Sequence, residues 1–137
     1  MNKIKYDSDL MKLMTLFESM TGAKVKDCIS NEKIIFVIEE NEMGKAIGKN
    51  GINIKRVEKV LKRNVKLIEF SNDPVQFVEN MLYPVEVQDI RQESDGITIY
   101  DKDTSTKAML IGRDRQNINH LSNIARRYFN IKEIRVA

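Results

Sequence analysis

A pattern that recurs 64 residues apart constrains this chain more than any other feature. The residues IGKN at 47–50 have a counterpart in IGRD at 111–114, and the pair NI at 53–54 recurs at 117–118. Solenoid repeats have periods of roughly 20–50 residues, so this offset is too long for a solenoid. It fits a small domain that occurs twice in a chain of 137 residues. We therefore predict two domains, residues 1–72 and 73–137.

Apolar periodicity and turn signals predict the same order of elements in both halves: helix, strand, strand, short helix, glycine turn, helix and strand. In the first half, Asp7-Ser8 can cap a helix that ends at Gly22. The later elements of that half are strands 24–29 and 33–39, a helix 52–63 and a strand 65–70. The second half has a helix 74–82, strands 85–92 and 96–101, a helical piece 106–110, a helix 116–128 and a last strand 131–136.

The net charge of +3 is unevenly distributed. Residues 45–63 hold seven Lys or Arg against one Glu, and residues 107–127 hold five against one Asp. These segments carry +6 and +4, so the rest of the chain carries −7. Two basic patches on an acidic body are typical of a protein with an anionic partner.

The stretch GKAIGKNG, residues 44–51, begins the first basic patch. It is not a nucleotide-binding P-loop, because three residues rather than four separate Gly44 from Gly48 and no hydroxyl follows Lys49. The dinucleotide fingerprint fails as well, since Ala46 stands where a second glycine is needed. A plain turn between two helices stays open as an interpretation. A loop that grips a nucleic-acid backbone explains the adjacent basic residues better, because Gly48 and Gly51 would let sugar and phosphate approach.

The motif IGKNG, between an apolar strand and an amphipathic helix, resembles a KH domain. A preceding helix and strand resemble the type II arrangement, and two such units resemble the archaeal NusA-like family of transcription factors. The resemblance implies an α+β fold with two tandem type II KH domains, each a three-stranded sheet with helices packed on one face. It also implies single-stranded RNA as a partner and a non-enzymatic role in transcription termination or antitermination, with RNA polymerase or its transcription complex as a further partner.

The candidate RNA-binding residues come from both glycine turns and the helices that follow them. In the first unit they are Lys45, Ile47, Gly48, Lys49, Asn50, Gly51, Ile54, Lys55 and Arg56. In the second unit they are Gly112, Arg113, Arg115, Gln116 and Asn117. Two interpretations of the second unit stay open, because arginine replaces the second glycine there. Either its side chains bind RNA, or it supports the first unit.

Catalysis, metal binding and a cofactor find no support in the sequence. His120 and Cys28 cannot form a zinc site by themselves, and we expect a surface histidine and a buried cysteine. The lone cysteine and the lack of a long apolar run predict a cytoplasmic protein without a membrane span. Two alternatives stay open: a ribosome-associated or RNA-processing KH protein, and an adaptor whose basic helices bind an acidic protein.

Overall fold

The computed structural model describes residues 8–137 and divides them into two compact units, residues 8–71 and 72–137. Each unit has the order helix, strand, strand, helix, helix, strand, with a 3-10 turn between the second and third helices. The elements of the first unit are α1 (Ser8–Thr21), β1 (Val25–Ser30), β2 (Ile34–Ile38), α2 (Met43–Ile47), the turn η1 (Lys49–Gly51), α3 (Ile52–Leu61) and β3 (Val65–Glu69). The order predicted from the sequence is confirmed.

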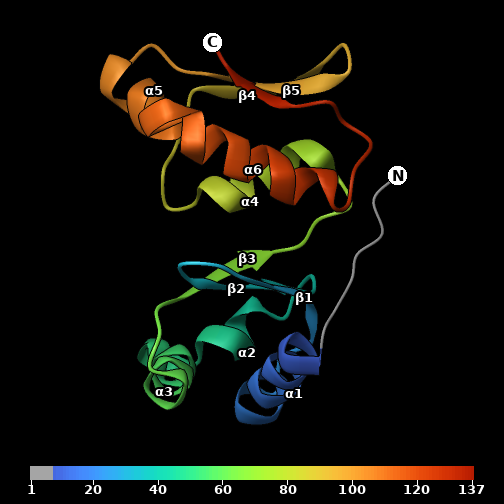
Figure 1. Ribbon diagram of the computed structural model, residues 1–137, viewed down its shortest axis with the longest axis vertical. Coiled ribbons are helices and arrows are strands. Elements are labelled where there is room, and N and C mark those ends of the chain that lie inside the picture. The colour runs from blue at the N-terminus through green and yellow to red at the C-terminus, as the bar shows by residue number, and fades with distance from the viewer. Residues whose placement is uncertain (1–7) are drawn as a thin grey trace. The chain divides into compact units, whose positions relative to one another are not determined.

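The first unit is a three-stranded sheet with its helices on one face (Figure 1). Strand β2 lies in the middle, antiparallel to β1 and parallel to β3, with Ile34 opposite Val65 and Ile38 opposite Glu69. All five residues of β2 are buried. Because the residues on both sides of the strand are buried, no polar alternation is needed, and the run IIFVI is continuously apolar.

The core of the first unit lies between α1 and the sheet. The rings of Phe17 and Phe36 are fully buried, with their centroids 4.3 Å apart. Val57 of α3 and Ala46 of α2 reach the same cluster, and Cys28 is buried beside them as expected. Val57 and Ala46 bring α2 and α3 onto the core, and this packing fixes the two ends of the glycine turn.

The second unit repeats this plan with a sheet of order β4-β5-β6 (Figure 1). Its elements are α4 (Pro74–Leu82), β4 (Asp89–Glu93), β5 (Gly96–Tyr100), α5 (Thr104–Ile111), the turn η2 (Arg113–Arg115), α6 (Gln116–Arg126) and β6 (Ile134–Val136). Helix α4 has the predicted bounds, because the Asp73 carboxylate accepts a hydrogen bond from the Val75 N–H at 3.1 Å and Pro74 begins the helix.

Two elements of the second unit start at other residues than predicted, in each case because of a local hydrogen bond to a carboxylate. The strand predicted from Val85 begins at Asp89, because the Gln88 N–H donates to the Asp101 carboxylate at 3.2 Å instead of joining the strand ladder. The helical piece predicted from Thr106 begins at Thr104, because the Asp103 side chain caps it by accepting from the Thr106 N–H.

The remaining differences concern ends and one helix face. Helix α3 stops at Leu61 rather than residue 63, and α6 stops at Arg126 rather than residue 128. The last strand starts at Ile134, three residues later than predicted. Val60 is apolar but 55% exposed, because the core takes up the side of α3 that carries Val57. The predicted cap at Asp7 lies outside the described residues, and Ser8 is the first residue of α1.

Candidate nucleic-acid interface

The turn between α2 and α3 has a backbone path that only certain residues can follow. Gly48 has φ 75° and ψ 172°, a region that is essentially restricted to glycine. Asn50 and Gly51 follow with φ 57° and 74°, both left-handed, and α3 then begins at Ile52. Asparagine is one of the few side chains that tolerate this conformation, so the sequence GKNG matches its backbone position by position.

Asn53 braces this turn from the first turn of α3. Its side-chain Nδ2 donates to the Lys45 carbonyl oxygen at 2.8 Å, so it ties α3 to the end of α2. A Cβ added to Gly48 would lie 2.7 Å from the Asn53 Cγ. Gly48 is therefore required by the internal packing of the turn, whatever binds outside it. Sequence reasoning attributed Gly48 to the approach of a ligand and missed the brace, although glycine and asparagine recur five residues apart in both turns.

The second turn repeats this geometry. Gly112 has the same φ and ψ as Gly48, 75° and 172°. The Asn117 Nδ2 donates to the carbonyl oxygens of Leu110 at 3.0 Å and Met109 at 3.2 Å. A Cβ on Gly112 would lie 2.8 Å from the Asn117 Cβ. Asn117 is a predicted RNA-binding residue, but its side-chain Nδ2 is therefore occupied by hydrogen bonds inside the turn.

Arg115 takes the place of Gly51 without changing the backbone. Asp114 and Arg115 have φ 53° and 62°, where Asn50 and Gly51 have 57° and 74°. An L-residue in this conformation costs about 1–2 kcal/mol relative to its ordinary backbone. The second turn thus keeps the path of the first with two strained residues, and both Arg115 and its neighbour Arg113 are exposed.

Both turns present backbone N–H groups at the start of a helix. No side chain caps α3, whose N-cap is Gly51, or α6, whose N-cap is Arg115. The N–H of Ile52 donates to the Lys49 carbonyl oxygen, and that of Gln116 donates to the Arg113 carbonyl oxygen. The N–H groups that follow in the first turn have no partner within the helix and lie at its partially positive end. This arrangement suits an anion such as phosphate.

Cations surround the first turn. Lys49, Lys55 and Arg56 are exposed, and the Lys55 Nζ lies 3.4 Å from the Asn50 carbonyl oxygen. The fourth predicted cation, Lys45, forms an ion pair, because its Nζ lies 3.3 Å from the carboxylate of Glu42.

Glu42 also accepts a hydrogen bond from the Lys24 N–H at 2.9 Å. This bond, together with Lys45, holds the pKa of Glu42 below its ordinary value of 4.5. Glu42 therefore stays ionised and offsets part of the charge of Lys45. The charges directly available to a ligand at the turn are those of Lys49, Lys55 and Arg56.

Apolar side chains border the same turn. Ile47 and Ile52, on either side of residues 48–51, are 40% and 54% exposed, which is unusual for large aliphatic residues. Ile54, a predicted RNA-binding residue, is half-buried. The first turn thus combines an exposed apolar border, cations that, apart from Lys45, have no ion pair within residues 8–137, and a helix start. In the second turn Gln116 replaces Ile52 and is exposed.

Within residues 8–137, no group of three or more His, Cys, Asp or Glu residues is arranged to hold a metal ion. His120 lies half-buried on α6, less exposed than predicted. None of the helices in the same range combines the length and the hydropathy that a membrane span requires.

The family model of the KH domain matches residues 14–79. A relative from Methanococcus vannielii called "Probable transcription termination protein NusA" is 35% identical, over 98% of this chain and 80% of the relative. A protein of the same name from Halococcus morrhuae is 29% identical, over 98% of this chain and 99% of its own. A crystal structure described as that of APE1850 is 23% identical with a TM-score of 0.74, covering 96% of this chain and all of the other, and shows the fold.

Fold and turns together define a protein of the KH class, with two tandem type II KH domains in an α+β arrangement. With a relative at 35% identity that is covered over four-fifths of its length, the chain belongs to the NusA-like family of these archaeal proteins.

Proposed function

We propose that this protein binds single-stranded RNA by gripping its sugar–phosphate backbone at residues 48–51, with residues 112–115 as a second contact. The observation that carries the proposal is the start of α3, which no side chain caps, beside the exposed Lys49 and Lys55. Backbone N–H groups and lysines in such a place bind phosphates, and KH loops clamp about four nucleotides. The exposed Ile47 and Ile52 would lie under the bases.

The residues of this site are those predicted from the sequence, with two changes of role. Gly48 and Asn117 maintain the turn, whereas Gly51, Lys49, Asn50, Lys55 and Arg56 face the ligand. At Gly51 the protein has room for a side chain, since the nearest atom to an added Cβ, the Lys55 Cε, is 3.6 Å away. The missing side chain therefore leaves space for the RNA backbone, and the packing of the turn does not require it. We place the two domains at residues 1–72 and 73–137, each carrying one loop.

Arg115 supports a binding role for the second loop. A glycine there would relieve the strain of φ 62°. An arginine in its place contributes a guanidinium that can contact phosphate or stack on a base. Arg115→Gly is therefore expected to raise the stability by about 1 kcal/mol and to weaken RNA binding. Unchanged or tighter binding would show that the second loop only supports the first.

The cellular role that we propose is in transcription termination or antitermination, as a cytoplasmic, non-enzymatic factor acting on nascent RNA with the transcription complex. The names of the relatives from M. vannielii and H. morrhuae support this role. Co-purification from cells tests it. Polymerase subunits are expected with the protein, whereas ribosomal particles alone would point to a role in ribosome biology.

The loop is tested by Lys49→Asp combined with Asn50→Asp. The second loop already holds Asp114 at φ 53°, the counterpart of Asn50, so the variant keeps a backbone that aspartate accepts. Losing one charge-assisted hydrogen bond costs about 1.5–3 kcal/mol, a loss of affinity of about tenfold or more. The affinity for a single-stranded RNA oligonucleotide is measured by fluorescence anisotropy.

The matched control is Asn130→Asp combined with Lys132→Asp. Both residues are exposed, and the pair changes the net charge by the same amount. The proposal predicts a large loss for the loop variant and a small one for the control. Equal losses in the two folded variants would refute a specific role of the loop.

A further inference from the structure

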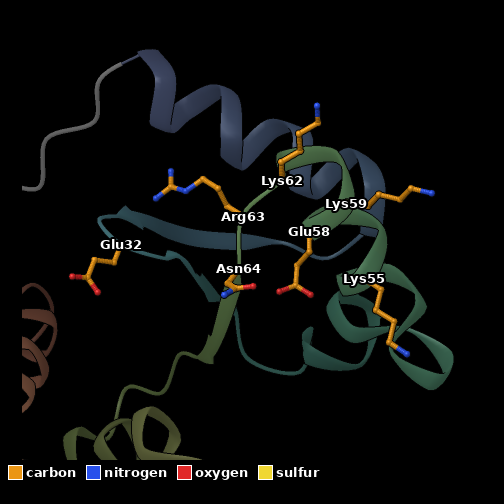
Figure 2. Close-up of a pocket in the computed structure, with 7 residues that line it drawn as sticks. All are labelled: Glu32, Lys55, Glu58, Lys59, Lys62, Arg63 and Asn64. Atoms are coloured by element: carbon orange, nitrogen blue, oxygen red, sulfur yellow. The ribbon is translucent and has the colours of Figure 1, made fainter.

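An open groove with a volume of about 630 Å³ runs along α3 of the first unit, beyond the glycine turn. It is lined by Glu32, Lys55, Glu58, Lys59, Lys62, Arg63 and Asn64. Figure 2 shows the three lysines projecting from successive turns of α3 and its end, while Arg63 extends toward the turn between β1 and β2. The groove begins at Lys55, which also contacts the glycine turn through the Asn50 carbonyl oxygen.

Two of the charged groups in this groove build its wall. The Arg63 guanidinium donates to the Ser30 Oγ at 3.1 Å and to the Asn31 carbonyl oxygen at 2.5 Å, which fixes the turn between β1 and β2. The Glu58 carboxylate accepts from the Val65 N–H at 3.0 Å. These contacts leave the three lysine ammonium groups and the exposed Glu32 carboxylate as the charges at the surface of the groove, so positive charge prevails by three to one.

Lys59 and Lys62 are exposed, and no ion pair with another residue of the described chain neutralises either of them. Like charges on neighbouring turns of a helix repel one another. Such a cluster is explained most directly by an anionic ligand that lies across it.

The fold does not require these lysines. In the second unit the positions of Lys55 and Lys59 are taken by Asn119 and Asn123, both exposed on α6. The same helix can therefore be built without the basic face. Lys55 and Lys59 are specific to the first unit, which also carries the intact glycine motif, whereas the counterpart of Lys62 is another cation, Arg126.

Lys62 supports the same conclusion through its backbone. It ends α3 in a left-handed conformation with φ 57° and ψ 35°. Glycine is the usual residue at such a helix end, because other residues are strained there. The counterpart in the second unit, Arg126, is still helical, so the strained ending is peculiar to the first unit. A lysine at a position where glycine would be unstrained suggests that the lysine side chain has a use.

The spacing suits a nucleic-acid strand. Lys55, Lys59 and Lys62 are four and three residues apart, about 6 Å and 4.5 Å along the helix axis. Each lysine carries a point charge on a flexible four-carbon stem, so the ammonium groups can adjust to neighbouring phosphates.

We propose that this groove is an extension of the RNA site, in which nucleotides beyond those at residues 48–51 lay their phosphates against Lys55, Lys59 and Lys62. The proposal rests on the proposed function and adds the path of the bound RNA, which runs from the glycine turn toward the turn between β1 and β2. Contacts to phosphate carry no base preference, so the groove lengthens the binding site and strengthens binding without changing sequence choice.

The test compares two single-stranded RNA oligonucleotides, of about 4 and about 12 nucleotides, the first just long enough for a KH loop. Lys59→Gln combined with Lys62→Gln is expected to weaken binding of the long oligonucleotide only. Each lost phosphate contact lowers the salt slope by about 0.7 for single strands, so the slope falls by about 1.4 in total. For each lost contact, the fall in affinity over a tenfold rise in salt concentration becomes about fivefold smaller.

The control is Lys102→Gln combined with Lys132→Gln, which removes the same charge from two exposed sites of the second unit. Equal losses for both oligonucleotides, or a loss no greater than in the control, would overturn the proposal. If the unaltered protein bound neither oligonucleotide, the proposed function itself would fail, which is a different result.

Lys62→Gly separates a role in binding from a role in folding. Relief of the left-handed strain is expected to raise the melting temperature, while binding of the long oligonucleotide weakens. A more stable protein with unchanged binding would contradict the role of Lys62. A variant that fails to fold is not expected, because glycine is the residue this backbone favours.

Discussion

Replacing Gly48 by alanine tests the structure of the glycine turn most sharply. At φ 75° and ψ 172° an alanine is strained by about 1–3 kcal/mol. Its Cβ would also lie 2.7 Å from the Asn53 Cγ and 2.8 Å from the Asn53 Nδ2. Asn53 would have to move, which breaks its 2.8 Å bond to the Lys45 carbonyl oxygen at a cost of about 0.5–1.5 kcal/mol. We expect a total loss of about 2–4 kcal/mol, a large share of the 5–15 kcal/mol typical of a domain.

Gly44→Ala is the matched control, four residues away. Gly44 lies inside α2 without a left-handed φ, and an added Cβ would meet no atom within 4 Å. Alanine in a helix interior is favoured over glycine by about 0.5–1 kcal/mol. The two substitutions add the same methyl group, yet their effects on stability should have opposite signs.

The assay is urea unfolding followed by circular dichroism, with the free energy of unfolding extrapolated to water. In an Asn53→Ala background, Gly48→Ala should cost about 1 kcal/mol less, because the two nearest atoms are gone and only the Asn53 Cβ, at 3.0 Å, is left. Equal effects of Gly48→Ala and Gly44→Ala, or no coupling with Asn53, would refute the account of the turn.

Three further predictions concern the frame around the site. Phe36→Ala removes a fully buried ring stacked 4.3 Å from Phe17 and should cost about 3–5 kcal/mol in urea unfolding, and a loss below 1 kcal/mol would be inconsistent with this core. Asp73→Ala removes the cap of α4 and should cost about 1 kcal/mol, whereas Asp73→Asn should retain most of it. Glu42 stabilises the fold above its unfolded pKa of about 4.5, and this contribution is lost as the pH falls through its lowered folded value. Glu42→Gln should therefore flatten the pH dependence of stability below about pH 5, and an unchanged slope would contradict the bonding of Glu42.

The parts of the fold that could be predicted from the sequence are those encoded by local signals. The repeat at an offset of 64 residues predicted the duplication, and Asp73-Pro74 predicted the first residue of α4 correctly. The strand predicted from Val85 was wrong, because its apolar alternation is matched by no partner strand before Asp89. Pairing across the sheet, rather than the local pattern, sets where β4 begins.

The site could be predicted only in outline. The glycine motif and the basic helix located it, but side-chain contacts that depend on packing were missed. Asn53 was not recognised as a brace, and the ion pair of Lys45 with Glu42 was not foreseen. The left-handed ending at Lys62 was equally hidden, since nothing in the run VLKRNV marks a residue with positive φ.

The most direct test of the central claim is to observe the backbone amides of the two turns by NMR while single-stranded RNA is added. The account predicts that the largest chemical-shift changes occur at Lys49–Gly51 and the first turn of α3, with smaller ones at Arg113–Arg115. Saturable binding of RNA that leaves the amides of Lys49–Gly51 unchanged would contradict it.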